Sequence, residues 1–204
     1  MARVVFLLRF CGLEPANGAP VGAVTEMRSG QRLQAVDFWM RNPDYLADAL
    51  IDDEEADGRA DGVALAKQIL ADREPQLRRL PMTKWRFGAW EELSDVLAPL
   101  LLGGLVVHQP TVRGDRTVAE HDYWLMPEGR DFIDTLLAAE PKTFGWYRDR
   151  AELIATVAKD TGGSALKARQ YKRIEYASTA GMALIPPITD AVQTRLESIE
   201  AAAA

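Results

Sequence analysis

The order of apolar patterns between residues 91 and 137 constrains the fold of this 204-residue chain more than any other feature. Residues 91–102 carry apolar side chains at the spacing of a helix with one core-facing side. Two short strands are expected next, at 105–108 and 121–125, and a second helix after Met126-Pro127. This order of helix, strand, turn, strand and helix is typical of a winged helix-turn-helix. A helix followed by an unrelated hairpin is the alternative.

Helical patterns flank this segment on both sides. Residues 3–11 fit either a buried helix or a strand, 33–41 form a helix that stops at Asn42-Pro43, and the tail from Thr143 is helical. We therefore expect a mainly α (α+β) fold with a small two-stranded wing. The sequence leaves open whether the N-terminal half forms a second, degenerate winged helix, which would give tandem winged helices. The expected regions are an N-terminal helical domain at 1–80, a winged-helix domain at 81–140 and a C-terminal helical region at 141–204.

Composition indicates a folded chain in a reducing compartment. Hydrophobic residues make up 48% and charged residues 26%, which is enough apolar material for a core. The single Cys11 excludes an internal disulfide, and one cysteine with two histidines cannot build a structural zinc site. The longest apolar stretch, residues 96–107, is too short for a membrane span, which needs about 20 residues. We expect a cytoplasmic protein with no cofactor, no metal and no membrane contact.

Residues that carry catalysis are scarce. His108 and His121 both fall on the expected wing, where a half-exposed histidine is more often structural than catalytic. Cys11 lies in an apolar stretch and is expected to be buried. Residues 162–167 resemble a phosphate-binding loop only superficially, since they follow a helix and have the wrong spacing. A metal site from the two histidines with Asp122 would be unusual on one wing. We therefore expect no enzyme and no catalytic residues.

Charge is distributed unevenly along the chain. The net charge is −6, yet residues 44–61 hold eight acidic residues and one basic residue, a local charge of −7. We expect Asp44 to cap a helix and the acidic residues to form a solvated loop, because their spacing does not match a calcium-binding EF-hand loop. Residues 142–173 hold eight basic and three acidic residues, a local charge of +5.

An acidic recognition helix argues against base-specific DNA reading. In a winged helix-turn-helix that reads DNA, the helix before the wing enters the major groove and exposes cations or amides. Here that helix would expose Glu91, Glu92 and Asp95 to the phosphates. DNA contact, if it occurs, is expected to be non-specific. One candidate group is the basic run from Arg73 to Arg86. The other candidates are Arg113 and Arg116 at the wing tip and Lys167, Arg169, Lys172 and Arg173 in the tail.

Protein partners are therefore the expected ligands of this chain. Acidic side chains on the pseudo-recognition helix and aromatic side chains near it suit an interface. Core packing is the alternative for each aromatic residue. The partner-binding candidates are Trp85, Trp90, Glu91, Glu92, Asp95, Trp146 and Tyr147.

Two stretches carry a family resemblance. Residues 33–47, which read LQAVDFWMRNPDYLA, are similar to the Leu-Asp-Phe-Leu-x-Arg-x-Pro-Asp-Tyr-Leu-Ala element of the middle components of bacterial ABC-three-component systems. This group includes Lamassu-type defence operons. Residues 82–90, with Trp85-Arg86-Phe87-Gly88-Ala89-Trp90, resemble the Arg-Tyr-x-Phe-Gly-Pro-Trp element before their winged-helix segment. The chain has Ala89 where that family tends to have proline.

The resemblance implies an accessory subunit encoded between an SMC-like ATPase and an effector, often a nuclease. Such a subunit would bridge the ATPase to the effector in an anti-phage or anti-plasmid complex and would itself catalyse nothing. One alternative is a stand-alone winged-helix transcription regulator that acts as a homodimer. Another is an antitoxin-like partner that covers an enzyme.

Overall fold

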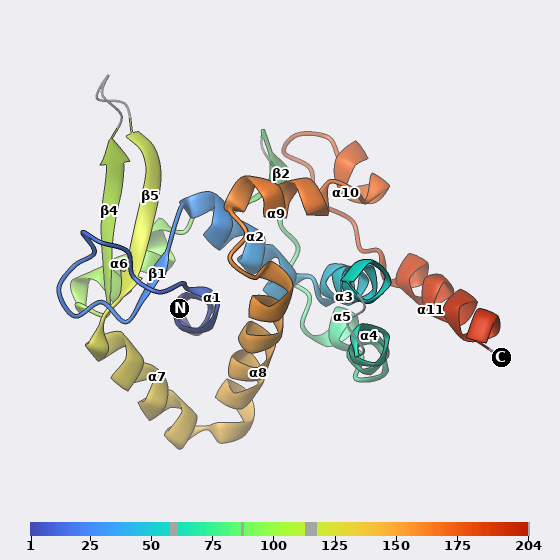
Figure 1. Cartoon of the computed structure of the whole chain (residues 1–204), viewed down its shortest axis with the longest axis horizontal. Coiled ribbons are helices and arrows are strands. Elements are labelled where there is room, and N and C mark those ends of the chain that lie inside the picture. Colours follow the sequence, from blue (N-terminus) through green and yellow to red (C-terminus); the bar gives the residue numbers. More distant parts are fainter. Residues whose placement is uncertain (58–60, 87, 113–117, 204) are drawn as a thin grey trace. The chain divides into compact units, whose positions relative to one another are not determined.

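The structure of the chain is a computed structural model that describes residues 1–57, 61–86, 88–112 and 118–203. The chain is mainly helical with small antiparallel sheets (Figure 1). It forms two compact units, each made of two stretches of chain. Unit 1 is residues 1–37 and 91–167, and unit 2 is residues 38–90 and 168–204. These units differ from the three consecutive regions expected from the sequence, because residues 38–90 interrupt unit 1.

Unit 1 packs helices around a three-stranded sheet. The undecided stretch at 3–11 is a helix, and five consecutive residues in it, 4–8, are buried. The helices and strands with residues in unit 1 are α1 (Ala2–Cys11), β1 (Thr25–Met27), α2 (Gly30–Arg41), α6 (Ser94–Leu102), β4 (Val106–Val112), β5 (Val118–Leu125), α7 (Pro127–Ala139), α8 (Pro141–Ala158) and α9 (Gly163–Gln170). Both α2 and α9 continue into unit 2.

The sheet of unit 1 has the order β1-β5-β4, with antiparallel neighbours. Leu125 of the central strand β5 pairs with Thr25 of β1 on one side and with Val106 of β4 on the other. Both strands expected after the helix are present and are longer than predicted. The described part of residues 1–80 contributes a single strand to this sheet, β1, so the N-terminal segment completes the β4–β5 sheet.

Unit 2 is built mainly from helices with a two-stranded hairpin. Among the described residues, no helix of either unit combines the length and the apolar character needed to cross a membrane. Besides its parts of α2 and α9, unit 2 contains α3 (Pro43–Asp57), α4 (Gly62–Ala71), α5 (Glu74–Leu77), β2 (Thr83–Trp85), β3 (Gly88–Trp90), α10 (Ile174–Ser178) and α11 (Thr189–Ala203).

The acidic segment is a packed helix. The prediction of a solvated loop at 44–61 is wrong for residues 44–57, which form α3 with Asp44, Asp48 and Asp53 buried. Burial of a carboxylate requires hydrogen-bonding partners, and the structure supplies them. Oδ2 of Asp44, for example, accepts a 2.6 Å hydrogen bond from the backbone N–H of Ile188. Burial raises the pKa of Asp44.

An aromatic core holds the hairpin of unit 2 in place. Tyr176 of α10 is fully buried, and its ring lies edge-on to Phe38 at 5.2 Å and to Tyr45 at 6.2 Å between centroids. Its hydroxyl accepts a 2.5 Å hydrogen bond from the backbone N–H of Ala89 in β3. Burial raises the pKa of the Tyr176 hydroxyl, so this group remains a neutral phenol. One face of the β2–β3 hairpin is thus fixed to the core.

Candidate functional site

A third extended segment joins the hairpin of unit 2. On one edge, β2 pairs with β3, with Thr83 opposite Trp90 and Trp85 opposite Gly88. On the other edge, Thr83 is bridged to Leu184. Further backbone hydrogen bonds link Lys84 to Ala183 and Ile185 to Met82, at 2.9 and 3.0 Å. The β2–β3 hairpin and an extended segment about 100 residues later in the chain therefore form one small antiparallel sheet.

One face of this small sheet is apolar and exposed. Residues that pair directly across antiparallel strands share a face, as do residues two apart along a strand. This register places Trp85, Trp90 and Leu184 on the same side, with exposed fractions of 43%, 39% and 62%. The two indole rings lie against each other at 6.1 Å between centroids. We call the exposed side chains of Trp85, Trp90 and Leu184, with the exposed Met182 beside them, the apolar face.

Met182 lies beside this face, two residues before Leu184, in an unusual backbone conformation. Residues 180–183 form a turn closed by a 3.1 Å hydrogen bond from Ala183 N–H to Ala180 O, and Met182 is its third residue with φ at 67°. A type II turn usually places glycine at that position. Met182 and Ala183 both bond to Lys84, which makes a β-bulge. The Met182 side chain is 65% exposed.

The opposite side of the hairpin packs inward. Nζ of Lys84 donates a 2.6 Å hydrogen bond to Ala177 O and lies 5.0 Å from the centroid of the Tyr171 ring. Ala89, across from Lys84, is buried. Because this side is occupied by the unit's own core, the sheet has one face left for a ligand.

The acidic candidates lie at the start of α6 in unit 1. The expected helix begins later than predicted, at Ser94, because the carboxylate of Glu92 accepts hydrogen bonds from the N–H and hydroxyl of Ser94 at 3.0 and 2.5 Å. These bonds, chiefly the one from the hydroxyl, lower the pKa of Glu92. Glu91 is half-buried, 3.3 Å from the Arg3 guanidinium. Glu92 and Asp95 are exposed, so α6 and its approach keep acidic side chains at the surface.

The other aromatic candidates are part of a packed cluster. Trp146 and Tyr147 lie in α8 of unit 1 and are half-buried. The Tyr147 ring is 6.0 Å from Phe6 of α1 between centroids, and the Trp146 ring is 5.1 Å from Tyr147. The structure therefore brings Trp85 and Trp90 together at the surface of unit 2, while Trp146 and Tyr147 support the α1–α8 packing of unit 1.

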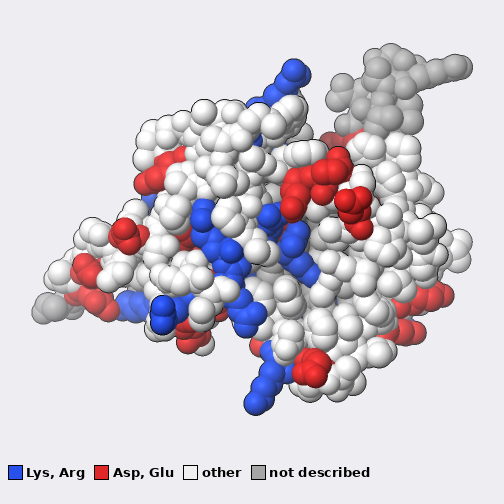
Figure 2. All heavy atoms as spheres, turned by 180° about the vertical axis from the view of Figure 1, so that it is seen from behind, with Lys and Arg blue, Asp and Glu red and all other residues white. Residues whose placement is uncertain are grey.

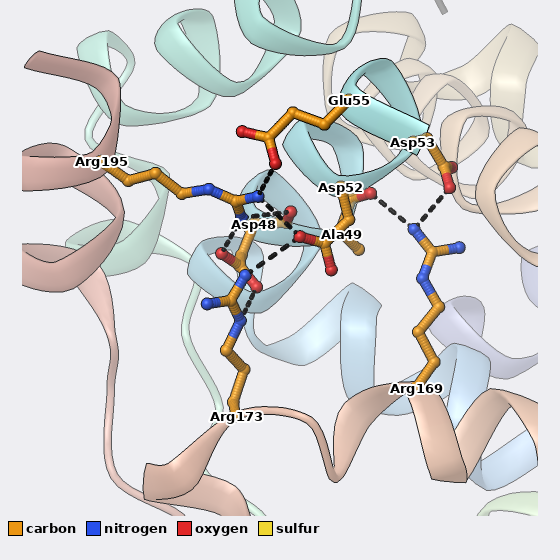
Figure 3. A network of polar contacts seen from close by, with 8 residues as sticks. All are labelled: Asp48, Ala49, Asp52, Asp53, Glu55, Arg169, Arg173 and Arg195. Carbon is orange, nitrogen blue, oxygen red and sulfur yellow. Dashed lines mark hydrogen bonds and ion pairs between the residues drawn. The ribbon is translucent and has the colours of Figure 1, made fainter. Parts of the chain in front are cut away.

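Three of the basic candidates in the tail are not free at the surface. Lys167 is buried, and this burial lowers its pKa. Arg169 donates a 2.7 Å hydrogen bond to Asp53, and Arg173 pairs with Asp48 and Asp52 (Figure 3). Burial or α3 carboxylates therefore engage these three side chains, and their contact with phosphates stays a prediction. Arg113 and Arg116 lie outside the described residues.

Lys172 is exposed and lines an open pocket of about 550 Å³ in unit 2. The remaining lining residues are Asp52, Glu55, Ala56, Arg173 and Arg195. Most of these side chains pair with one another, so the pocket offers little unneutralised charge. Figure 2 shows one face of the molecule, on which acidic and basic side chains both reach the surface and uncharged residues cover most of the area.

The Cys11 thiol and the rings of His108 and His121 contact other groups of unit 1. Burial raises the pKa of the Cys11 thiol to about 12, and its Sγ lies 3.3 Å from Ala151 O. Nε2 of His108 lies 2.8 Å from Nδ1 of His121, and the rings stack. Within the described ranges, no three histidine, cysteine or acidic side chains converge where they could hold a metal ion.

Sequence reasoning missed Met182 and Leu184. Residues 176–189 contain no charged side chain and read YASTAGMALIPPIT, which is a signal for an apolar segment at a surface or in a core. The sequence alone could not pair this segment with β2, because about 100 residues separate the two in the chain.

Comparison of the chain with protein-family models, with curated protein sequences and with solved structures gives no match at a significant level.

Proposed function

We propose that the chain is a non-enzymatic adaptor subunit that binds a protein partner through the apolar face of unit 2. The observation that carries this proposal is the pair of adjacent tryptophans, Trp85 and Trp90, each about two-fifths exposed on one side of a sheet. Tryptophan is enriched among the residues that dominate binding energy at protein interfaces. A contiguous exposed apolar patch on a soluble domain marks an interaction site.

The partners in this proposal come from the family resemblance. An SMC-like ATPase and an effector, commonly a nuclease, would be the two proteins that the subunit connects in an anti-phage or anti-plasmid defence complex. A chain with two compact units suits a bridging role, since each unit offers its own surface. The buried Cys11 thiol and the paired His108 and His121 agree with a subunit that performs no catalysis.

Unit 1 is, in this proposal, a winged helix with residues 38–90 of unit 2 inserted into it. Its elements follow the order α1, β1, α2, α6, β4, β5, and its sheet has the order β1-β5-β4. A winged helix has the same order of elements, with its third strand in the middle of the sheet. Residues 38–90 of unit 2 would then be an insertion between the second and third helices.

A winged-helix regulator that acts as a homodimer on DNA is the second candidate function. The sheet order of unit 1 favours it. The sequence of α6, SDVLAPLLL, opposes it because the helix in the recognition position contains no arginine, lysine, asparagine or glutamine. We therefore assign protein binding to the chain and confine DNA contact to non-specific electrostatics.

Co-purification tests the adaptor function. The full chain is co-expressed with the coiled-coil ATPase encoded beside it, and the pair is isolated through a tag on the ATPase. We expect a stable complex that the double variant Trp85→Ala/Trp90→Ala loses, while the fully exposed Val21→Ser control retains it. A monodisperse chain that ignores the ATPase would overturn the proposal. Operator-specific DNA binding that persists at high salt would instead establish the regulator.

A further inference from the structure

We infer that the apolar face of unit 2 receives an acidic amphipathic segment of a partner protein, in which carboxylates flank apolar side chains. This inference rests on the proposed adaptor function and adds the chemistry of the partner. The charges along the segments that build the sheet, the two arginines at its ends and the side chains on its exposed side all favour such a partner.

The hairpin segment carries a local excess of positive charge in sequence. Between Glu74 and Glu91 the chain has four basic residues and no acidic residue. Between Glu175 and Asp190 it has no charged residue at all. In a chain with a net charge of −6, these are the segments that supply all three extended strands of the small sheet. The segment from Pro75 to Trp90 is therefore a positive stretch of an acidic chain, and it ends at Glu91 and Glu92 directly after Trp90.

Two arginines bracket the sheet along its strands. Arg86 is exposed and directly follows Trp85 in the turn of the hairpin. Arg79 lies at the opposite end, where its Nη2 donates a 2.6 Å hydrogen bond to Ile185 O, next to Leu184. Cations at the rim of an apolar centre favour a partner with carboxylates at its periphery, because complementary charges speed encounter and set orientation.

The side chains of the apolar face favour a protein over a nucleic acid. Single-stranded nucleic acids bind to aromatic rings on which successive bases stack. Here the two indole rings are tilted 38° to each other, Leu184 is exposed on the same side, and the exposed Met182 lies two residues from it in the chain. Aliphatic and thioether groups pack well against leucine-like side chains, and methionine adapts to irregular surfaces.

Site-specific crosslinking in the full chain tests this inference. The photoreactive residue p-benzoylphenylalanine replaces Trp90, with a matched control at the fully exposed Val21 of unit 1. The protein is expressed with its neighbouring genes, irradiated, and the attached peptide is sequenced by mass spectrometry. Thermal unfolding of each variant verifies that it folds. We expect one partner peptide with a net negative charge and apolar residues at regular spacing, and no such product from Val21.

Charge reversal supplies the second part of the test. Arg86→Glu should lower the yield of this crosslink about tenfold, whereas reversal of an exposed residue elsewhere, Lys142→Glu, should leave it unchanged. Replacing a carboxylate of the identified peptide with lysine should restore the yield with Arg86→Glu.

The outcomes separate this inference from the adaptor function. A basic or uncharged peptide, an adduct with nucleic acid, a crosslink to a second copy of this chain, or no crosslink at Trp90 would overturn the acidic partner. If the ATPase co-purifies in any of these cases, the adaptor function stands and only the acidic partner segment is ruled out. If nothing co-purifies, the adaptor function fails as well.

Discussion

Nη1 of Arg195 in α11 lies 2.8 Å from Oδ1 of Asp48 in α3, a carboxylate whose side chain is only 6% exposed. The same guanidinium reaches Asp52 and Glu55, each at 2.8 Å (Figure 3). Burial acts to lower the pKa of Arg195, but the hydrogen bonds of Asp52 and Glu55 and the charges of Asp48 and Asp52 outweigh it and raise this pKa. The C-terminal helix is thus fixed to the acidic helix by charge pairing inside unit 2.

Loss of Arg195 should destabilise unit 2. Arg195→Met keeps the length of the side chain but leaves Asp48 and Asp52 with fewer donors, and we expect the free energy of unfolding to fall by about 2 kcal/mol. The matched control is Arg148→Met, because Arg148 pairs with its exposed neighbour Asp149 and should cost less than about 0.5 kcal/mol. Urea unfolding monitored by circular dichroism measures both. Equal effects of the two variants would contradict this account.

The crossing of α3 and α4 depends on a glycine. A Cβ atom at Gly62 would lie 2.2 Å from the backbone oxygen of Leu50, and backbone cannot move aside cheaply. We expect Gly62→Ala to lower the free energy of unfolding by about 1–3 kcal/mol.

Gly145 provides the opposite control. It lies within α8, and a Cβ atom there would meet no atom within 4 Å. Gly145→Ala should therefore stabilise the protein by about 0.5–1 kcal/mol, since alanine loses less conformational entropy in a helix. Thermal melts of both variants should shift in opposite directions, and a shared direction would rule out the close approach at Gly62 as the cause.

The histidine pair on β4 and β5 predicts a pH dependence. Burial, with a contribution from His121, lowers the pKa of His108 from its ordinary value of 6.5. A base with a lowered pKa in the folded state stabilises the fold above pH 6.5, and this contribution is lost as the pH falls through the folded pKa. We expect His108→Gln to reduce the loss of stability between pH 7.5 and pH 5. Denaturant unfolding at both values tests this, and an unchanged difference would contradict it.

Local patterns predicted local elements well. The helix predicted at 33–41, the strands predicted at 105–108 and 121–125 and the helix predicted after Met126-Pro127 all correspond to elements of the structure, although β4 and β5 are longer than predicted. The pairing of distant segments could not be predicted. The carboxylates of α3 look solvated in sequence because their partners, Arg173 and Arg195, lie more than 100 residues away.

The apolar face was also predictable only in its local part. Trp85 and Trp90 are close in sequence and flank a glycine, so a hairpin that exposes both was within reach of sequence reasoning. Leu184 joins them only through a bridge to Thr83 across the small sheet. Nothing local to residues 180–185 indicates which strand they pair with. Lys167 illustrates the converse case, since a lysine in a helical basic segment gives no local sign of burial.

Met182 should lower the free energy of unfolding of the chain, because its backbone conformation disfavours a side chain. At a φ of 67° the side chain of an L-residue is strained, and glycine relieves this strain. We expect Met182→Gly to raise the free energy of unfolding by about 1 kcal/mol and, at the same time, to weaken partner binding by removing part of the apolar face. Met182→Ala keeps the strain, so it should weaken binding without the gain in stability. Thermal melts and titration of the co-purifying partner separate the two effects. If Met182→Gly stabilises the chain and binds the partner as tightly as before, the side chain has no part in the interface and the apolar face shrinks to Trp85, Trp90 and Leu184.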